Sequence, residues 1–277
     1  MKIRIGTGFL VFCVFASALS LPAVQKSFFE YLNFAEQSHH AAYSTYSRNL
    51  LVLEWSNGIC NEAGGCINYP FYPRTQFSVK LKGLWPSAED RNTGAEVALL
   101  DCDPSNKLQR DKFSSPLPEE SYYQWNDLFW ANSLQQLWSK HGACWNPSLT
   151  QLEKVPSYLA GVAKDAKTAY SELNQASVQQ SYFTTAMKLA NHFNRGVIDA
   201  LNSLSVSRDG SYSIFDVSNE IKKRFRISKM HMRCTASNRG QSILSDIRFC
   251  LDLNYNLINC RRDANDCDSV VHFPVRA

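Results

Sequence analysis

Two short segments of the chain carry side chains that could do chemistry together. In the first, Lys82 and Trp85 stand in Lys-Gly-Leu-Trp-Pro; in the second, Lys140 is followed directly by His141. Histidine has a reference pKa of about 6.5 and can take up or release a proton near neutral pH, whereas a lysine stays charged and attracts phosphate. A histidine beside lysines could transfer a proton next to a bound anion, if the fold brings the two segments together.

The expected secondary structure places each segment at the end of an element. Residues 77–81 alternate apolar and polar side chains, which predicts a strand with one buried face that leads into a loop at Lys82. Residues 124–140 carry apolar side chains mostly at three- and four-residue steps, which predicts an amphipathic helix that stops at Gly142. Lys82 would then stand at a strand end, and His141 at a helix end.

The rest of the chain combines both kinds of element. Short apolar or alternating runs predict strands at residues 50–55, 243–253 and 270–274, whereas helical periodicity covers residues 182–204 and the segment that starts at residue 213. Helices in the middle and strands at both ends favour an α+β fold. No repeat, low-complexity run or linker divides the chain, so we expect one domain at residues 21–277.

The N-terminus has the pattern of a secretory signal peptide over residues 1–20. Lys2 and Arg4 precede an apolar stretch and small residues, and no later stretch approaches about 20 apolar residues. Without this segment, 27 Lys and Arg face 25 Asp and Glu, a net charge of only +2. We therefore expect a secreted protein outside the membrane, or one in the lumen of the endolysosomal pathway. Any RNA contact would come from a shaped cleft rather than from bulk charge.

Removal of Cys13 with the signal peptide leaves eight of the nine cysteines. An even number in a secreted chain predicts four disulfides, although their connectivity does not follow from spacing. Cys60 and Cys66 bracket two glycines, which suits a local bridge.

The two chemical segments, their order and their surroundings resemble the ribonuclease T2 family. Lys82-Gly83-Leu84-Trp85-Pro86 is similar to the first signature of that family, His-Gly-Leu-Trp-Pro. The segment from Gln136 to Cys144 is similar to the second, His-Glu-Trp-x-Lys-His-Gly-Thr-Cys. The resemblance implies one domain with a central antiparallel sheet packed with helices. It also implies the pairs Cys60–Cys66, Cys102–Cys144, Cys234–Cys267 and Cys250–Cys260.

The resemblance further implies a reaction and its residues. In the family, the ribose 2′-hydroxyl attacks the adjacent phosphorus of RNA to give a 2′,3′-cyclic phosphate, without a metal or other cofactor. His141 stands where the family has its base, and Lys140 where a lysine stabilises the charge of the transition state. Trp85 matches the tryptophan that stacks on a base, and Ser87 stands where an aspartate commonly follows the proline.

Three other positions of this site differ from the family pattern. Lys82 replaces the histidine that acts as general acid, Gln136 replaces a phosphate-binding histidine, and Leu137 replaces a glutamate that supports the charged network. With a reference pKa of about 10.4, a lysine is a reluctant proton donor near pH 5 to 7. Loss of one acid or base role typically costs about 10² to 10⁴ in rate. We therefore expect endoribonuclease activity to be weak or lost.

Three functions stay open from the sequence. The first is a monomeric family member that retains a cleft for single-stranded RNA or nucleotides. The second is an extracellular protein-interaction module that uses another surface. The third is an active endoribonuclease in which Lys82 serves as the cation and a recruited group as the acid. Each site residue also has a structural interpretation: Lys82 as a surface lysine, His141 as a structural histidine, and Trp85 as a core aromatic.

Overall fold

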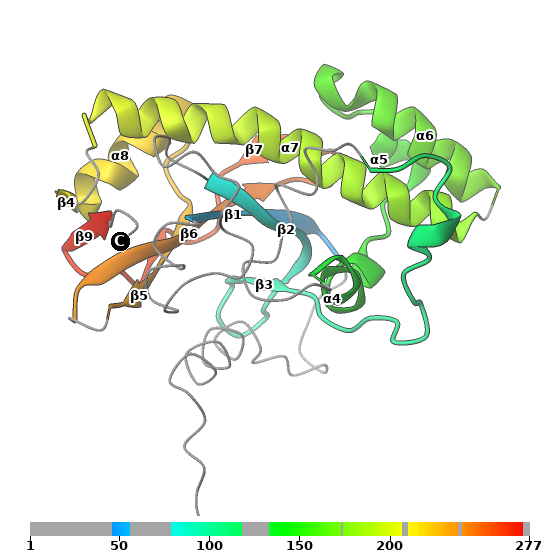
Figure 1. The fold of residues 1–277 in the computed structure, drawn as a ribbon, viewed down its shortest axis with the longest axis horizontal. Coiled ribbons are helices and arrows are strands. Elements are labelled where there is room, and N and C mark those ends of the chain that lie inside the picture. Colours follow the sequence, from blue (N-terminus) through cyan, green and yellow to red (C-terminus); the bar gives the residue numbers. More distant parts are fainter. Residues whose placement is uncertain are drawn as a thin grey trace, which may run out of the picture.

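The described part of the chain folds into a curled sheet with helices packed against it (Figure 1). The structure is a computed structural model, and it describes residues 46–55, 79–117, 133–172, 174–206, 210–237 and 240–273. The expected signal peptide and the Cys60–Cys66 pair lie outside these residues, so both stay predictions. Within the described ranges, no helix is long and apolar enough to cross a membrane.

The sheet has the strand order β3-β2-β1-β6-β5-β8, with three short strands beside this path. The bounds are β1 Arg48–Trp55, β2 Val79–Glu89, β3 Glu96–Ala98, β4 Gly210–Ser213, β5 His231–Ala236, β6 Ser242–Leu251, β7 Leu257–Ile258, β8 Ala264–Asn265 and β9 Val270–Phe273. The expected antiparallel centre is confirmed from β3 to β5. At its margins β8 pairs with β5 and β9 with β6 in parallel, so the whole sheet is mixed.

The described helices include the predicted ones and two that were not predicted, at residues 149–152 and 160–171. They are α4 Ser133–Lys140, α5 Leu149–Leu152, α6 Ala160–Ser171, α7 Gln175–Ser203 and α8 Ile214–Phe225. Helix α7 starts earlier than expected, because the side chain of Asn174 accepts a hydrogen bond from the Ser177 N–H and caps it. Ser213 caps α8 in the same way through the Asp216 N–H. The expected helix at 124–140 is described only over α4.

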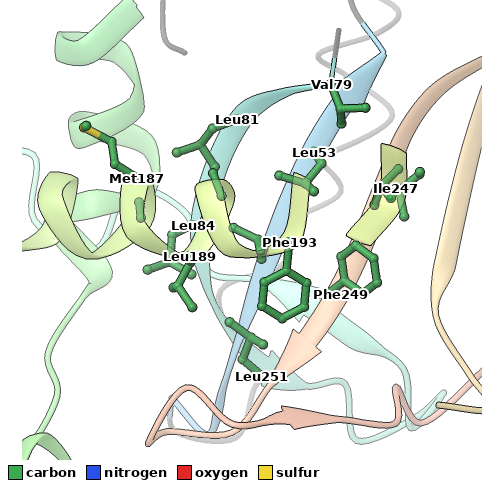
Figure 2. Packing of buried hydrophobic residues seen from close by; sticks show 14 of the residues in the cluster. Leu53, Val79, Leu81, Leu84, Met187, Leu189, Phe193, Ile247, Phe249 and Leu251 are labelled. Atoms are coloured by element: carbon green, nitrogen blue, oxygen red, sulfur yellow. The ribbon is translucent and has the colours of Figure 1, made fainter. Parts of the chain in front are cut away.

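One face of the sheet is buried by α7 (Figure 2). Leu51 and Leu53 of β1 point to this face, whereas Leu50 and Val52 belong to a second buried cluster on the opposite face. Phe193 of α7 packs on Phe249 of β6 with ring centroids 4.9 Å apart, and Phe225 of α8 stacks on Phe193 at 5.2 Å. Successive side chains of β1 therefore enter two separate hydrophobic clusters, and the strand is buried on both faces.

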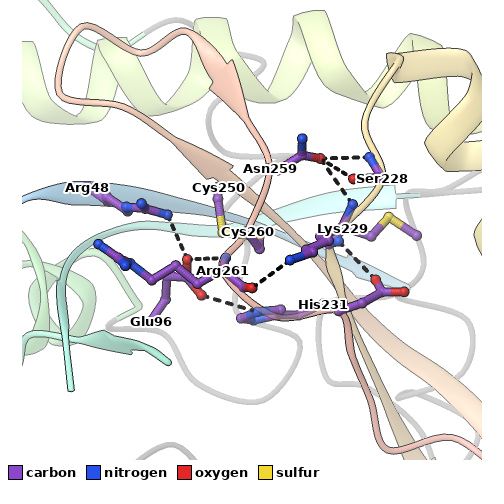
Figure 3. Close-up of a disulfide and its surroundings, with 11 residues drawn as sticks. Arg48, Glu96, Ser228, Lys229, His231, Cys250, Asn259, Cys260 and Arg261 are labelled. Atoms are coloured by element: carbon purple, nitrogen blue, oxygen red, sulfur yellow. Dashed lines mark hydrogen bonds and ion pairs between the residues drawn. A yellow bond between two sulfur atoms is a disulfide. The ribbon is translucent and has the colours of Figure 1, made fainter. Parts of the chain in front are cut away.

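Three disulfides lie in the described residues, and they join three of the four expected pairs: Cys102–Cys144, Cys234–Cys267 and Cys250–Cys260. Figure 3 shows Cys250–Cys260 beside the buried carboxylate of Glu96. Arg48 donates a hydrogen bond of 2.8 Å to this carboxylate, and the Arg261 N–H donates one of 2.6 Å. The disulfide and Glu96 together attach the segment after β7 to β1, β3 and β6.

Gly196 should be essential for the packing of α7 on α8. A Cβ at this position would lie 2.5 Å from the ring of Phe225. We expect Gly196→Ala to lower the free energy of unfolding by about 1–3 kcal/mol, because the ring must move out of the core. Gly161 in α6 is the matched control, since a Cβ there meets no atom within 4 Å. Gly161→Ala should stabilise by about 0.5 kcal/mol. Urea unfolding measures both, and equal effects would contradict the packing argument.

Candidate active site

Lys82 is presented by a β-bulge rather than by a loop. Val52 of β1 pairs with Gly83 and Leu53 pairs with Leu81, so Lys82 is the additional residue on β2. The expectation of a loop at this point is wrong, because β2 continues through Trp85 to Glu89. Its register with β1 and the burial of Leu84 and Trp85 keep the strand paired. The bulge directs Lys82 to the face of the sheet opposite α7, which we call the site face.

The second segment reaches the site face from α4. Leu137 packs against the second buried cluster, and the His141 N–H donates to the Leu137 carbonyl oxygen at 3.0 Å, which continues the helix by one bond. The turn then tightens at Gly142, where a Cβ would lie 2.4 Å from the ring of Trp138. The Cys102–Cys144 disulfide holds the end of this turn. Local packing therefore sets the position of His141.

Trp85 and His141 meet ring to ring. Their centroids are 4.6 Å apart with an interplanar angle of 15°, and the residues are 3% and 6% exposed. Gly83 makes this contact possible, because a Cβ there would lie 2.5 Å from Trp85 Nε1 and 2.8 Å from Leu137 Cδ1. Among the described residues, Trp85 Nε1 has no hydrogen-bond partner. The two signature segments are thus joined through an aromatic stack.

His141 is held as a neutral ring. Its Nδ1 lies 3.2 Å from the carbonyl oxygen of Leu99, which can only accept, so Nδ1 carries the proton and Nε2 the lone pair. Burial lowers the pKa of His141 to about 3, although the hydrogen bond to Leu99 by itself raises this pKa. The charges of Lys140, Lys82 and Arg248 lower it further. His141 is therefore uncharged across pH 4 to 8.

Lys82 is paired with a carboxylate that the sequence analysis did not identify. Its Nζ lies 3.2 Å from Oδ2 of Asp246, and Oδ1 of that carboxylate accepts from Arg248 Nε at 2.7 Å. Burial lowers the pKa of Lys82 to about 8, although the charge of Asp246 by itself raises this pKa. The ammonium is therefore still charged at pH 5 to 7. Burial alone would raise the pKa of Asp246, but Arg248 and Lys82 hold it at about 2.

The comparisons with known proteins agree with this geometry. A sequence profile described as the Ribonuclease T2 family matches residues 46–260. The chain belongs to the ribonuclease T2 family. It is 23% identical over 215 residues to "Ribonuclease Oy" of Magallana gigas, which covers 76% of this chain and 84% of that protein. It is 25% identical over 227 residues to "Ribonuclease T2" of Danio rerio, covering 80% of this chain and 75% of the relative.

Solved structures of two ribonucleases share the fold. The crystal structure of RNase NT in complex with 5′-AMP matches with a TM-score of 0.59 at 17% identity, over 83% of this chain and 99% of that one. Ribonuclease MC1 from the seeds of bitter gourd matches with a TM-score of 0.56 at 20% identity, over 82% and 99%. These likenesses show the α+β fold that the sequence predicted.

Within this family fold, the carried-over residues lie in different environments. Lys82, Trp85, Leu137 and His141 are gathered on the site face by the contacts above, and the charge of Lys140 acts on His141. Gln136 is exposed on α4. Ser87 is fully buried on β2, and its hydroxyl has no hydrogen-bond partner in the structure. The predicted convergence of these side chains on one site is therefore clearest for Trp85 and His141, whose rings stack.

A sequence signal for the missed acidic residue does exist. Asp246, Arg248 and Cys250 alternate along β6 with the core residues Ile247, Phe249 and Leu251. A charged residue in a strand that is apolar on its other face must find a partner if both faces are buried. The pattern of residues 243–253 predicted one strand, but it was not divided into the residues of its two faces.

The low pKa of His141 predicts a loss of stability in acid. The unfolded chain takes up a proton near pH 6.5, whereas folded His141 takes one up only near pH 3, so the unfolding free energy falls as the pH drops between these values. From pH 7 to 4.5 the wild-type protein should lose about 2 kcal/mol more than His141→Asn, whose amide does not titrate. Urea unfolding at both pH values measures the difference. An equal loss in both proteins would show that His141 titrates normally.

Proposed function

We propose that the chain is a secreted ribonuclease T2 homologue, with a signal peptide at residues 1–20 and one domain at residues 21–277. Its cleft binds single-stranded RNA or nucleotides, and its endoribonuclease activity is weak or lost. The family assignment and the ribonuclease names of its relatives support the ligand class. The complex of RNase NT with 5′-AMP shows a nucleotide on the same fold.

The pairing of Lys82 with Asp246 is the observation that carries the impaired activity. Lys82 stands where the family has its general acid, and that acid must give its proton to the departing 5′-oxygen. An ammonium whose hydrogen bond is directed to a buried carboxylate at 3.2 Å is attracted to that carboxylate instead. Lys82 can still attract phosphate, but it is a poor replacement for imidazolium at pH 5 to 7.

The base and its support are weakened as well. His141 keeps a lone pair on Nε2, but a nitrogen with a pKa near 3 draws a proton from a hydroxyl less strongly than an ordinary imidazole does. Leu137, in the place of the family glutamate, offers no charge to stabilise imidazolium. Gln136 offers only a neutral amide. Together these changes remove several groups that would stabilise one transition state, and the resulting losses in rate do not simply add.

Nucleobase binding at Trp85 would require a change in the aromatic stack. The indole is 3% exposed and lies against His141, so a base can reach its face only if the stack opens. Ser87, on the same strand, is fully buried and supports no direct reading of the base. We therefore propose weak base preference, with phosphate contacts providing most of the affinity.

Residual cleavage by Lys82 is the second candidate function. The observation that favours it is the pKa of about 8, because a lysine with a lowered pKa is a stronger acid than an ordinary lysine. In this case the protein would cleave RNA slowly and leave cyclic phosphate ends.

A ribonuclease assay of the purified protein across pH 4 to 8, beside an active relative, tests the proposed function. We expect a rate at least about 100-fold below that of the relative, because at least one acid or base role is missing. Detection of 2′,3′-cyclic phosphate ends identifies any residual reaction. A rate equal to that of the relative would contradict the proposal.

Restoration of activity should need several replacements together: Lys82→His to supply an acid, Gln136→His to bind phosphate, and Leu137→Glu to support the charges. Each single variant should gain little, whereas the triple variant should cleave readily at mildly acidic pH. Leu137→Glu should also raise the pKa of His141, because it places a carboxylate beside the Trp85–His141 stack. Rates on the same RNA measure the gains.

Lys112→His is the control for these variants, since Lys112 is exposed on the short helix Arg110–Lys112. It adds an imidazole without changing the site, and its rate should equal that of the wild type. If the wild-type protein already matches the triple variant, Lys82 is part of a working enzyme and the impaired-site proposal is wrong.

A further inference from the structure

The site face contains an acidic group among the cations that would meet RNA phosphates. The side chain of Asp246 on β6 is 1% exposed, and both of its oxygens accept hydrogen bonds. Oδ1 accepts from Arg248 Nε at 2.7 Å, and Oδ2 accepts from Lys82 Nζ at 3.2 Å and from Arg248 Nη2 at 3.4 Å. The carboxylate thus lies between a lysine and the fork of an arginine.

The two cations are more accessible than the anion that they hold. The side chains of Lys82 and Arg248 are 18% and 16% exposed. Both also lie over the indole of Trp85, with Lys82 Nζ 5.9 Å and the Arg248 guanidinium carbon 5.1 Å from the ring centroid. A ligand that approaches this ring therefore meets both cations before it meets Asp246.

Two β-bulges create this arrangement. Lys82 is the additional residue of the bulge between β1 and β2. A second irregularity occurs between β5 and β6, where Arg233 pairs with Asp246 but Cys234 pairs with Leu244, so Ser245 is additional. Bulges re-aim side chains. Here they bring Lys82 and Asp246 together across the intervening strand β1.

The chemistry of the cations is that of a phosphate site. An arginine fork with a nearby ammonium binds carboxylate and phosphate oxygens through the same charged hydrogen bonds. We propose that Asp246 is an internal anion that fills the phosphate subsite of Lys82 and Arg248 and thereby sets the affinity of this cleft for RNA phosphates. This inference rests on the proposed function. In it, Asp246 is the residue that limits the affinity of the cleft for phosphate.

The hydrogen bonds of the cluster support competition between the two anions. Among the described residues, Lys82 and Arg248 both donate to the one carboxylate of Asp246, and Glu54 of β1 stands opposite Asp246 in the register with β6. Arg233, opposite Asp246 on β5, forms an ion pair of 2.7 Å with Asp266. An incoming phosphate must therefore displace Asp246 or share its two cations with it, and either costs affinity.

Replacement of Asp246 by its isosteric amide tests the proposal. Asp246→Asn keeps the shape and removes the competing charge, so inorganic phosphate and 5′-AMP should bind about tenfold more tightly or better. Isothermal titration at pH 6 and low salt measures both ligands. Asp199→Asn is the matched control, because Asp199 of α7 forms an exposed ion pair with Arg224 of α8, and removal of its negative charge should leave phosphate affinity unchanged. Adding Lys82→Gln to Asp246→Asn should abolish the gain.

A measurement on the wild-type protein makes the test independent of the folding of the variant. Phosphate that displaces Asp246 should shift the ¹³C resonance of its carboxylate at saturation. Equal affinity in wild type and Asp246→Asn, or an unchanged resonance with phosphate bound, would overturn the proposal. The ribonuclease assay on the same proteins separates the two questions: rapid cleavage by the wild type contradicts the proposed function, whereas the affinity ratio decides the role of Asp246.

Discussion

Burial of the central strands on both faces is the constraint on which the rest of the structure depends. Helix α7 covers one face of β1, β2 and β6, and the segment from α4 to His141 covers part of the other. A charge placed between such layers must find a partner, because desolvation of an unpaired ion costs several kcal/mol. The Lys82–Asp246–Arg248 cluster satisfies this requirement, and its location next to Trp85 is a consequence of the sheet register.

This requirement connects the charge of Lys82 with the proposed loss of activity. A lysine in a half-buried site needs a counter-ion, and Asp246 supplies it at 3.2 Å; in our proposal, the same place would hold a substrate phosphate. Burial is the main reason that the pKa of His141 is low, and the charges of Lys140, Lys82 and Arg248 lower it further. The packing that stabilises the fold thus also sets the protonation state of His141.

Local patterns in the sequence were sufficient for much of the fold. The apolar run of β1 and the helical periodicity of α7 and α8 predicted those elements, because β1 is buried on both faces and each helix buries one apolar stripe. The bulge at Lys82 was not predictable, since it arises from the register of β1 against β2 and not from the residues of β2 alone. Asp246 was missed for a related reason: it is 164 residues from Lys82, and only the sheet order makes them neighbours.

The Cys102–Cys144 disulfide has a consequence for the motions of the site. It ties the turn after α4 to the segment that follows β3, and the Asp101 N–H donates to the Lys140 carbonyl oxygen at 2.9 Å beside it. A short helix of eight residues would otherwise fray easily at its end. With this end cross-linked, fraying of α4 cannot carry Lys140 and His141 away from the sheet. The cross-link thereby also protects the hydrogen-bonded amides of His141, Cys144 and Trp145 from local fraying.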